Sequence, residues 1–254
     1  MLAIVTGGTG FVGSHIVDEL LRRGMRVRCL IRPSSNTRWL RDAKVDVIEV
    51  DFADQDSVTT ACAGATYIIH CAGVIAASSA EAYMEGNKHM TETMLRAAIV
   101  QAGTLRRFLH ISSLSAVGPA ASVHEPVDSS TTPHPITEYG RSKLAAENSV
   151  QQAASKIPTT IIRPPAVYGE RDEATVSVFQ AMRYHIALLM GFTPKWVSLV
   201  YVGDLVRGSV DAMESNVTIG KTYALAGEKA YTWSEISQEI GEAVHTWFVR
   251  LRLP

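Results

Sequence analysis

Short runs of hydrophobic, often β-branched residues alternate with longer segments of helical periodicity over the first two thirds of the chain. We expect these runs to be buried strands, at Leu2–Thr6, Arg26–Ile31, Val45–Val50, Tyr67–Cys71, Arg107–Ser112 and Thr159–Arg163. Parallel strands need long connections, and right-handed crossovers place the connecting helices on both faces of the sheet. The pattern therefore predicts an α/β fold built on a doubly wound parallel sheet.

The segments between the runs predict helices at Ser14–Arg23, Asp54–Ala63, Asn87–Gln101 and Tyr139–Ala154. After Arg163 the chain becomes rich in proline, glycine and short elements, and Thr232 to Glu235 match a capping box that opens a last helix. We expect a main domain over residues 1–165 and a small lobe mainly over residues 166–254, with some segments of the second part returning to the main domain. The chain stops abruptly, and we expect its C-terminus to be incomplete.

Charge and cysteine content limit the kinds of partner. With 24 basic and 25 acidic residues the formal charge is -1, which gives no electrostatic reason to expect nucleic acid or an acidic membrane surface. Cys29, Cys62 and Cys71 fit neither a zinc site nor a disulfide framework. The sequence has no apolar run long enough to span a bilayer and no signal-peptide pattern. We expect a soluble, cytoplasmic protein that binds small molecules and no metal.

A cluster of glycines follows the first expected strand and opens the first expected helix. Gly7, Gly10 and Gly13 are suited to a tight turn, to close approach of a pyrophosphate, and to a helix N-terminus that offers unpaired N–H groups and a favourable dipole. Many strand–helix turns contain glycine for geometric reasons alone. The βαβ pattern around this one favours dinucleotide binding on a Rossmann-type sheet.

The end of the second expected strand bears on the choice of dinucleotide. A site that prefers NAD usually has Asp or Glu there, to accept hydrogen bonds from the adenosine 2′-hydroxyl. This chain has Arg32 instead, which could pair with the 2′-phosphate of NADP or could be an ordinary solvated arginine. We expect NADP or NAD as the cofactor, with NADP favoured.

Tyr139 and Lys143 are four residues apart, on one face of an expected helix. At about 6 Å and an effective dielectric constant of about 20, the ammonium would stabilise the phenolate by about 3 kcal/mol, which lowers the pKa of the phenol by about two units. Proton transfer of this kind accompanies hydride chemistry at a carbinol or carbonyl. Ser112 and Ser113 end the fifth expected strand, at the edge where open parallel sheets bind ligands, and could hold the same substrate oxygen.

Three segments resemble the short-chain dehydrogenase/reductase superfamily, and more closely its extended branch, the NAD-dependent epimerase/dehydratase family. The segments are Thr6-Gly7-Gly8-Thr9-Gly10-Phe11-Val12-Gly13, Phe108-Leu109-His110-Ile111-Ser112-Ser113-Leu114-Ser115-Ala116-Val117-Gly118, and Tyr139 with Lys143. The resemblance covers nearly the whole chain. It implies that Ser113 is the catalytic serine, Tyr139 the general acid/base, and Lys143 both the group that tunes Tyr139 and a ligand of the nicotinamide ribose.

The resemblance also implies which residues bind the cofactor, and Arg32 joins them as the candidate ligand of the 2′-phosphate. They are Gly7, Thr9, Gly10, Phe11, Val12, Gly13, Arg32, Asp51, Phe52, Cys71, Ala72, Gly73, Asn87, Ser112, Tyr139, Lys143, Pro164 and Val167. Two of them have a structural alternative, because Asp51 could cap the helix that follows it and Asn87 could be an ordinary N-cap.

The expected activity is reversible hydride transfer at a secondary alcohol or ketone. The enzyme could be an epimerase, of a nucleotide sugar for example, or an NADP-dependent ketone reductase or hydroxysteroid dehydrogenase-like enzyme. Leu114 stands where sugar-nucleotide dehydratases of the family carry an Asp-Glu pair, so we do not expect elimination of water. A non-catalytic NAD(P)-binding sensor or assembly factor is the alternative of another class. The helices Asn87–Gln101 and Tyr139–Ala154 resemble those of a four-helix dimer interface, which predicts a homodimer.

Overall fold

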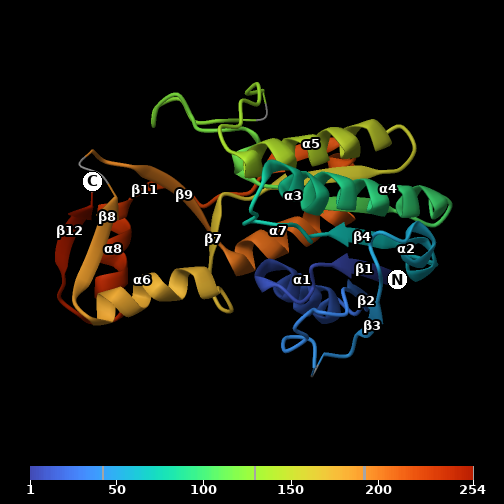
Figure 1. Ribbon diagram of the computed structural model, residues 1–254, viewed down its shortest axis with the longest axis horizontal. Helices are drawn as coiled ribbons and strands as arrows, with labels where there is room; N and C mark the ends of the chain where they lie inside the picture. Colours follow the sequence, from blue (N-terminus) through green and yellow to red (C-terminus); the bar gives the residue numbers. More distant parts are fainter. Residues whose placement is uncertain (42, 129, 191–192, 254) are drawn as a thin grey trace.

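The computed structural model describes residues 1–41, 43–128, 130–190 and 193–253. At its centre is a seven-stranded sheet with the strand order β10-β6-β5-β4-β1-β2-β3 (Figure 1), in which every neighbouring pair is parallel. Its strands are β1 (Leu2–Thr6), β2 (Arg26–Ile31), β3 (Asp46–Glu49), β4 (Tyr67–His70), β5 (Arg107–Ile111), β6 (Thr159–Arg163) and β10 (Lys221–Ala224). The predicted α/β fold with a doubly wound parallel sheet is confirmed.

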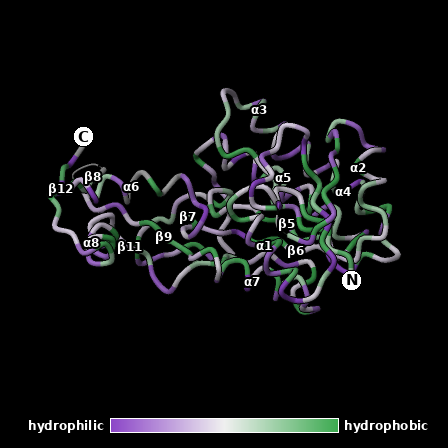
Figure 2. The backbone as a smooth tube through the Cα atoms, turned by 90° about the horizontal axis from the view of Figure 1, so that it is seen from below, coloured by the Kyte–Doolittle hydropathy of each residue, from purple (hydrophilic) through white to green (hydrophobic). Residues whose placement is uncertain are grey.

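Helices cover both faces of this sheet. Around it lie α1 (Phe11–Arg22), α2 (Gln55–Ala61), α3 (Ala80–Met84), the π-helical turn η1 (Glu85–His89), α4 (Met90–Val100), the 3-10 turn η2 (Leu114–Ala116), α5 (Glu138–Ala153), α7 (Val202–Glu214) and the 3-10 turn η3 (Asn216–Thr218). In β1, Val5 packs with α1 and α7 in one hydrophobic core, and Ile4 packs with α2, α4 and α5 in the other. All residues of β5 and β6 are buried, as expected of strands that helices cover on both faces, and both strands include polar side chains such as Arg107 and Thr160. Figure 2 shows hydrophobic segments gathered in the central sheet around these strands.

The sheet differs from the prediction at both edges. One edge strand, β10, comes from the C-terminal part of the chain and pairs with β6, which adds a seventh strand to the six expected. The expectation of a buried strand at Val45–Val50 is wrong, because only Asp46–Glu49 forms a strand and all four of its residues are exposed. This strand, β3, is the last in the order and pairs only with β2, so its outer side has no neighbouring strand among the described residues.

The remaining elements form a lobe beside the central sheet (Figure 1). They are β7 (Ala166–Tyr168), α6 (Glu173–Arg183), β8 (Ile186–Met190), β9 (Trp196–Tyr201), β11 (Ala230–Thr232), α8 (Trp233–Ala243) and β12 (Val249–Leu253). β9 joins β7 and β11 in one small sheet, and β8 pairs with β12 in another. Thr232 and Glu235 form the predicted capping box at the start of α8.

Arg107 on β5 forms hydrogen bonds with the segment from α7 to η3, which leads back to the central sheet. Its buried Nη1 donates hydrogen bonds to Thr160 Oγ1 (2.8 Å), Thr218 Oγ1 (2.6 Å) and Ala212 O (3.2 Å), and its Nη2 donates to Ser215 O (3.0 Å). A single guanidinium thus joins β5 and β6 to the end of α7 and to η3, which precede β10.

We expect Arg107→Met to lower the free energy of unfolding by about 2–4 kcal/mol, because it leaves buried oxygen atoms without a donor. Chemical denaturation of both proteins measures the difference. The exposed neighbour Arg106 provides the control, since Arg106→Met is expected to change stability by less than about 0.5 kcal/mol. Equal effects of the two substitutions would contradict this role for Arg107.

Candidate active site

The glycine turn between β1 and α1 requires its glycines for steric reasons. Gly7 has a φ of +74°, and a Cβ there would lie 2.7 Å from the amide nitrogen of Ala72. A Cβ on Gly13 would lie 2.0 Å from the carbonyl oxygen of Gly7, so α1 can start this close to the turn only with glycine at that position. Gly10 is the N-cap of α1 and has no side chain with which to cap it.

This turn has the features of an anion cradle. The first amides of a helix have no intrahelical acceptor, and those of α1 begin directly after Gly10, at the carboxyl end of β1. Thr9, Phe11 and Val12 lie on the same turn and are partly exposed. A pyrophosphate therefore fits the geometry of the turn.

The segment after β4 lies against the glycine turn. The amide of Ala72 donates to Thr6 Oγ1 (3.3 Å), and the amide of Cys71 donates to the carbonyl oxygen of Thr6 (3.3 Å). Burial raises the pKa of the Cys71 thiol to about 11, so it stays a thiol at neutral pH. A Cβ on the next glycine, Gly73, would lie 2.7 Å from Asn87 Oδ1 and 3.8 Å from Lys143 Nζ. The structure thus brings Gly73, Asn87 and Lys143 together.

Ser113 and Tyr139 meet at the carboxyl end of β5. Ser113 is the N-cap of η2, and its Oγ accepts a hydrogen bond from the amide of Ser115 (3.1 Å). Tyr139 lies in the first turn of α5, which is capped by the Thr137 side chain. A hydrogen bond from the Ser113 hydroxyl lowers the pKa of Tyr139, although burial has the larger, opposite effect. The ring of Tyr83 on α3 lies beside Tyr139, with 6.2 Å between ring centroids.

Burial is the largest influence on the pKa values of both Tyr139 and Lys143, and the expected tuning of Tyr139 by Lys143 stays a prediction. Burial raises the pKa of Tyr139 above its ordinary value of 10, and Lys143 is not among the groups that shift it. The Lys143 side chain is itself buried, with Nζ donating to the carbonyl oxygen of Ile111 (2.9 Å). Burial lowers the pKa of Lys143 to about 8, against the opposing influence of Cys71 and Glu147. Desolvation is therefore the largest influence on the pKa of each group.

Asn87 joins three segments of the site and is not an N-cap. It lies inside η1, in the middle of the continuous helical run from α3 to α4. Its Oδ1 accepts from the amide of Val74 (2.8 Å), and its Nδ2 donates to the carbonyl oxygen of Val74 (3.0 Å) and to Ser142 Oγ (2.9 Å). The side chain thus holds the segment after β4 against α5.

A buried ion pair between α5 and β6 was not predicted. Glu147 is fully buried and pairs with Arg163, whose Nη2 donates to Oε2 at 2.6 Å. Ser112 Oγ donates to Glu147 Oε1 (2.5 Å), so the hydroxyl of Ser112 is used within the protein. Glu147 follows Lys143 by four residues, which puts both on the inner face of α5. A glutamate on a helix face that also carries Val150 was the available signal.

The other expected cofactor residues are spread along the same edge of the sheet. Arg32 is exposed just after β2, Asp51 and Phe52 follow β3, Pro164 follows β6, and Val167 lies in β7. The helix cap is Asp54, which accepts from two amides of α2, so the alternative role of Asp51 as that cap is wrong. Asp51 instead accepts a hydrogen bond from the amide of Ala53 (2.9 Å).

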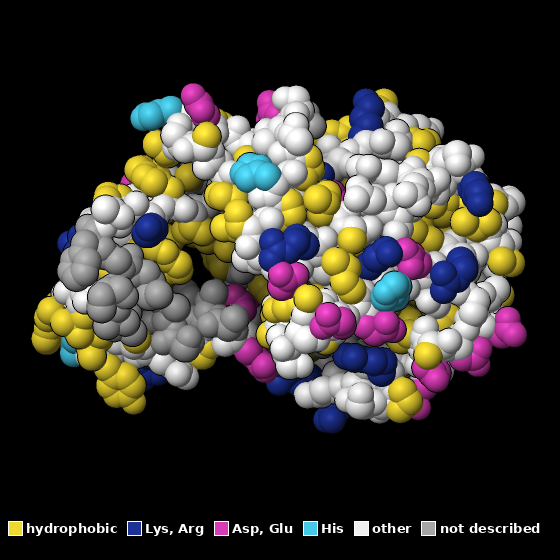
Figure 3. Space-filling model, turned by 45° about the horizontal axis from the view of Figure 1, so that its top comes forward, with side chains coloured by type: hydrophobic (Ala, Val, Ile, Leu, Met, Phe, Trp, Pro, Cys, Tyr) yellow, Lys and Arg dark blue, Asp and Glu magenta, His cyan; other side chains and the backbone are white. Residues whose placement is uncertain are grey.

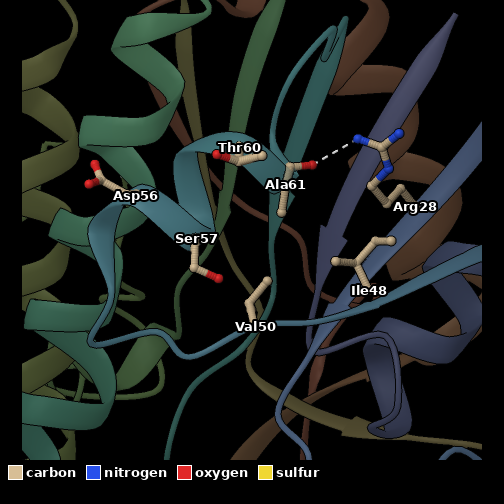
Figure 4. A pocket seen from close by; sticks show the side chains of 7 residues that line it. All are labelled: Arg28, Ile48, Val50, Asp56, Ser57, Thr60 and Ala61. Carbon is tan, nitrogen blue, oxygen red and sulfur yellow. Dashed lines mark hydrogen bonds between the residues drawn. The ribbon is translucent and has the colours of Figure 1, made fainter.

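A separate hollow of about 550 Å³ lies beside β2, β3 and α2. Figure 4 shows its lining by Arg28, Ile48, Val50, Asp56, Ser57, Thr60 and Ala61, with the Arg28 guanidinium donating to the carbonyl oxygen of Ala61 (2.9 Å). None of the expected site residues is among them.

In the described ranges, His, Cys, Asp and Glu form no group of three that could hold a metal ion. Nor does any helix in that part of the chain have the length and apolar character needed to cross a membrane.

The parallel sheet and its glycine cradle define a dinucleotide-binding α/β protein. The profile of the NAD dependent epimerase/dehydratase family matches residues 3–226, and the chain belongs to this family. It is an enzyme of the oxidoreductase and epimerase type that depends on a nicotinamide dinucleotide, as predicted.

Relatives with assigned names include both reductases and epimerases. The chain is 30% identical to ceramide reductase of Caulobacter vibrioides over 98% of its own length and 73% of the relative. It is 28% identical to sterol demethylase protein B of Methylococcus capsulatus, over 100% of this chain and 78% of the relative. The UDP-glucose 4-epimerase of Thermus thermophilus, solved in complex with NAD, superposes with a TM-score of 0.85 at 26% identity, covering 99% of this chain and 86% of the epimerase.

The lowered pKa of Lys143 predicts how the free energy of unfolding changes with pH. The folded pKa of about 8 is below the ordinary 10.5, so between these values the folded protein binds fewer protons than the unfolded chain, and stability rises with pH. From pH 7 to pH 9.5 we expect the unfolding free energy of the wild type to rise by about 2 kcal/mol relative to Lys143→Met.

Denaturant titrations of the two proteins across this range measure that difference. The buried thiols of Cys29 and Cys62, whose pKa values burial raises, act in the opposite direction above pH 9, but Lys143 does not influence them and their effect cancels between the two proteins. A difference that does not change with pH would show that Lys143 keeps an ordinary pKa.

Proposed function

We propose that the enzyme transfers hydride reversibly at a secondary alcohol or ketone, with net reduction or oxidation of the substrate. The observation that carries this proposal is the meeting of Ser113 and Tyr139 at the carboxyl end of β5, beside the buried Lys143. Ligands of open parallel sheets bind at this edge. The glycine turn after β1 lies at the same edge and would hold the pyrophosphate of the cofactor.

The remaining expected residues are proposed as the rest of the cofactor site. They are Thr9, Phe11, Val12, Arg32, Asp51, Phe52, Cys71, Ala72, Gly73, Asn87, Ser112, Pro164 and Val167, with Tyr139 and Lys143 on the nicotinamide side. When bound, the dinucleotide supplies or accepts the hydride. The hydroxyl of Ser112 and the side chain of Asn87 already have partners within the protein, so both residues would act through the positions that they fix.

Tyr139 would exchange the proton that accompanies the hydride. Because burial raises its pKa, the phenol carries its proton at neutral pH and is ready to donate it to a carbonyl oxygen, which favours the direction of reduction. The hydroxyl of Ser113 would hold the same substrate oxygen. Lys143, held by the carbonyl oxygen of Ile111, would place its positive charge beneath the reacting groups.

Apolar side chains near Tyr139 favour a lipid-like substrate. Ile136 and Ile75 are 69% and 78% exposed. Ile136 precedes Tyr139 by three residues, and the carbonyl oxygen of Ile75 accepts from the hydroxyl of Tyr83, whose ring lies beside Tyr139. The named relatives ceramide reductase and sterol demethylase protein B support the same substrate class. Figure 3 shows hydrophobic side chains beside a hollow between the central body and the C-terminal lobe.

Epimerisation of a nucleotide sugar is the second candidate. It would use the same three side chains, and the likeness to UDP-glucose 4-epimerase of Thermus thermophilus supports it.

Three further expectations are part of the proposal. Residues 1–165 would be the dinucleotide-binding domain and residues 166–254 mainly the substrate lobe, with α7 and β10 as the parts that return to the main domain. A homodimer would form through α4 and α5, which lie side by side on one face of the sheet (Figure 1). The three unpaired cysteines are consistent with a cytoplasmic location.

We expect Tyr139→Phe to lower carbonyl-dependent oxidation of NAD(P)H at least about 100-fold, because the proton donor is removed. Absorbance near 340 nm, the ordinary signal of reduced nicotinamide, follows turnover with a panel of keto-lipids and ketosteroids, and chromatography follows UDP-glucose epimerisation. Tyr83→Phe is the matched control and should keep most of the activity. If Tyr139→Phe turns over any substrate as fast as the wild type, the proposed role of Tyr139 is wrong.

Cofactor preference tests Arg32. We expect the wild type to bind NADPH more tightly than NADH, and Arg32→Ser to weaken NADPH binding about tenfold while leaving NADH binding within about twofold. Fluorescence titration with each dinucleotide measures both constants. Equal weakening of the two would mean that Arg32 does not contact a 2′-phosphate.

A further inference from the structure

A buried hydrogen-bonded chain crosses the protein behind the site and centres on His70, the last residue of β4. Its Nδ1 lies 2.7 Å from Thr6 Oγ1, and its Nε2 lies 3.0 Å from Thr91 Oγ1. Thr6 Oγ1 also accepts from the amide of Ala72 (3.3 Å), and Thr91 Oγ1 donates to the carbonyl oxygen of Asn87 (2.6 Å). The chain therefore runs from Ala72 through three side chains to Asn87.

The direction of each hydrogen bond follows from counting protons. The single hydroxyl proton of Thr91 goes to the carbonyl oxygen of Asn87, so Thr91 Oγ1 must accept from His70 Nε2–H. In a neutral imidazole Nδ1 is then the acceptor, and it receives the hydroxyl proton of Thr6. Thr6 Oγ1 is left free to accept from Ala72, as observed. Only the Nε2–H tautomer satisfies the whole chain.

The surroundings of His70 keep the ring neutral. His70 is fully buried, and the ring of His110 stacks on it with 5.5 Å between centroids. Burial, with a smaller contribution from the positive charge of Lys143, lowers the pKa of His70 to about 3. The tautomer is therefore fixed across the physiological pH range.

The two ends of the chain lie on the two halves of the site. At one end, the amide of Ala72 lies so close to Gly7 that a Cβ on Gly7 would stand 2.7 Å from it. At the other end, Asn87 holds Val74 and the hydroxyl of Ser142. Ser142 directly precedes Lys143 on α5. The hydrogen bonds of His70 thus connect the glycine turn to the catalytic helix.

We propose that His70 is a positioning residue that couples the dinucleotide-binding turn to the helix carrying Tyr139 and Lys143. We assign no chemical step of the reaction to His70, because its ring is enclosed within the protein. Thr6 and Thr91 carry the coupling, because each hydroxyl accepts one hydrogen bond and donates another, all in the same direction from Ala72 to Asn87. The effect on catalysis rests on the proposed function, whereas the coupling within the free protein does not.

Thr91→Val tests the chain because it removes the hydroxyl while keeping the shape of the side chain. We expect the amides of Ala72 and Val74 to exchange with solvent at least about fivefold faster in this variant, since loss of one buried hydrogen bond weakens its neighbours. Thr93→Val is the matched control, because Thr93 is a buried threonine of the same helix whose hydroxyl accepts from Arg96 instead. In the Thr93→Val protein the amides of Ala72 and Val74 should exchange within about twofold of the wild-type rates. Equal exchange in the two variants would overturn the proposal.

Two further measurements complete the test. Nitrogen-15 NMR of the free protein should show His70 as the Nε2–H tautomer from about pH 5 to about pH 8, and an Nδ1–H ring or an imidazolium would overturn the proposal. NADH titration should show binding weakened at least about fivefold in Thr91→Val but not in Thr93→Val. Faster exchange with unchanged NADH affinity would overturn the coupling to the dinucleotide site. If the wild type binds neither NADH nor NADPH, the proposed function fails, while amide exchange and NMR still judge the coupling.

Discussion

The buried ion pair between Glu147 and Arg163 fixes the position of α5 against the sheet. Two charges taken out of water are tolerated only if they satisfy each other and their remaining hydrogen-bonding capacity. Arg163 at the end of β6 binds the carboxylate from one side, and Ser112 at the end of β5 donates to it from the other. α5 is thereby fixed against two adjacent strand ends, and this places Tyr139 beside Ser113.

Burial also sets the acid–base properties of the site. The same removal from water that holds α5 in place raises the pKa of Tyr139 and lowers that of Lys143 to about 8. Both shifts favour the neutral form of the group. In the free protein at neutral pH the pair is therefore a protonated phenol near an ammonium whose pKa is only about 8. A phenol that carries its proton at neutral pH can donate it to a carbonyl oxygen.

Glycine and polar side chains connect the cofactor edge to the rest of the molecule. Gly7 and Gly13 let the first turn of α1 approach β1 and the segment after β4, which no larger residue would permit. Asn87 and His70 continue the connection by hydrogen bonds within the core. Such buried polar networks define one arrangement because each member loses its partner in any other. The lobe built from α6, α8 and the small sheets stands apart from this network (Figure 1).

Local patterns in the chain were enough to predict the order of most strands and helices, the glycine turn, and Tyr139 and Lys143 as a candidate catalytic pair, because hydrophobic periodicity and short motifs involve only neighbouring positions. The choice of Ser113 over Ser112 came from the resemblance to a known family. They could not predict the seventh strand or the exposure of β3, since pairing partners and edges arise only when distant segments meet. Nor could they give the pKa directions of Tyr139 and Lys143 or the contacts of His70 and Glu147. Those depend on how much water each group loses and which partner it gains, and both are decided by packing among elements far apart in the chain.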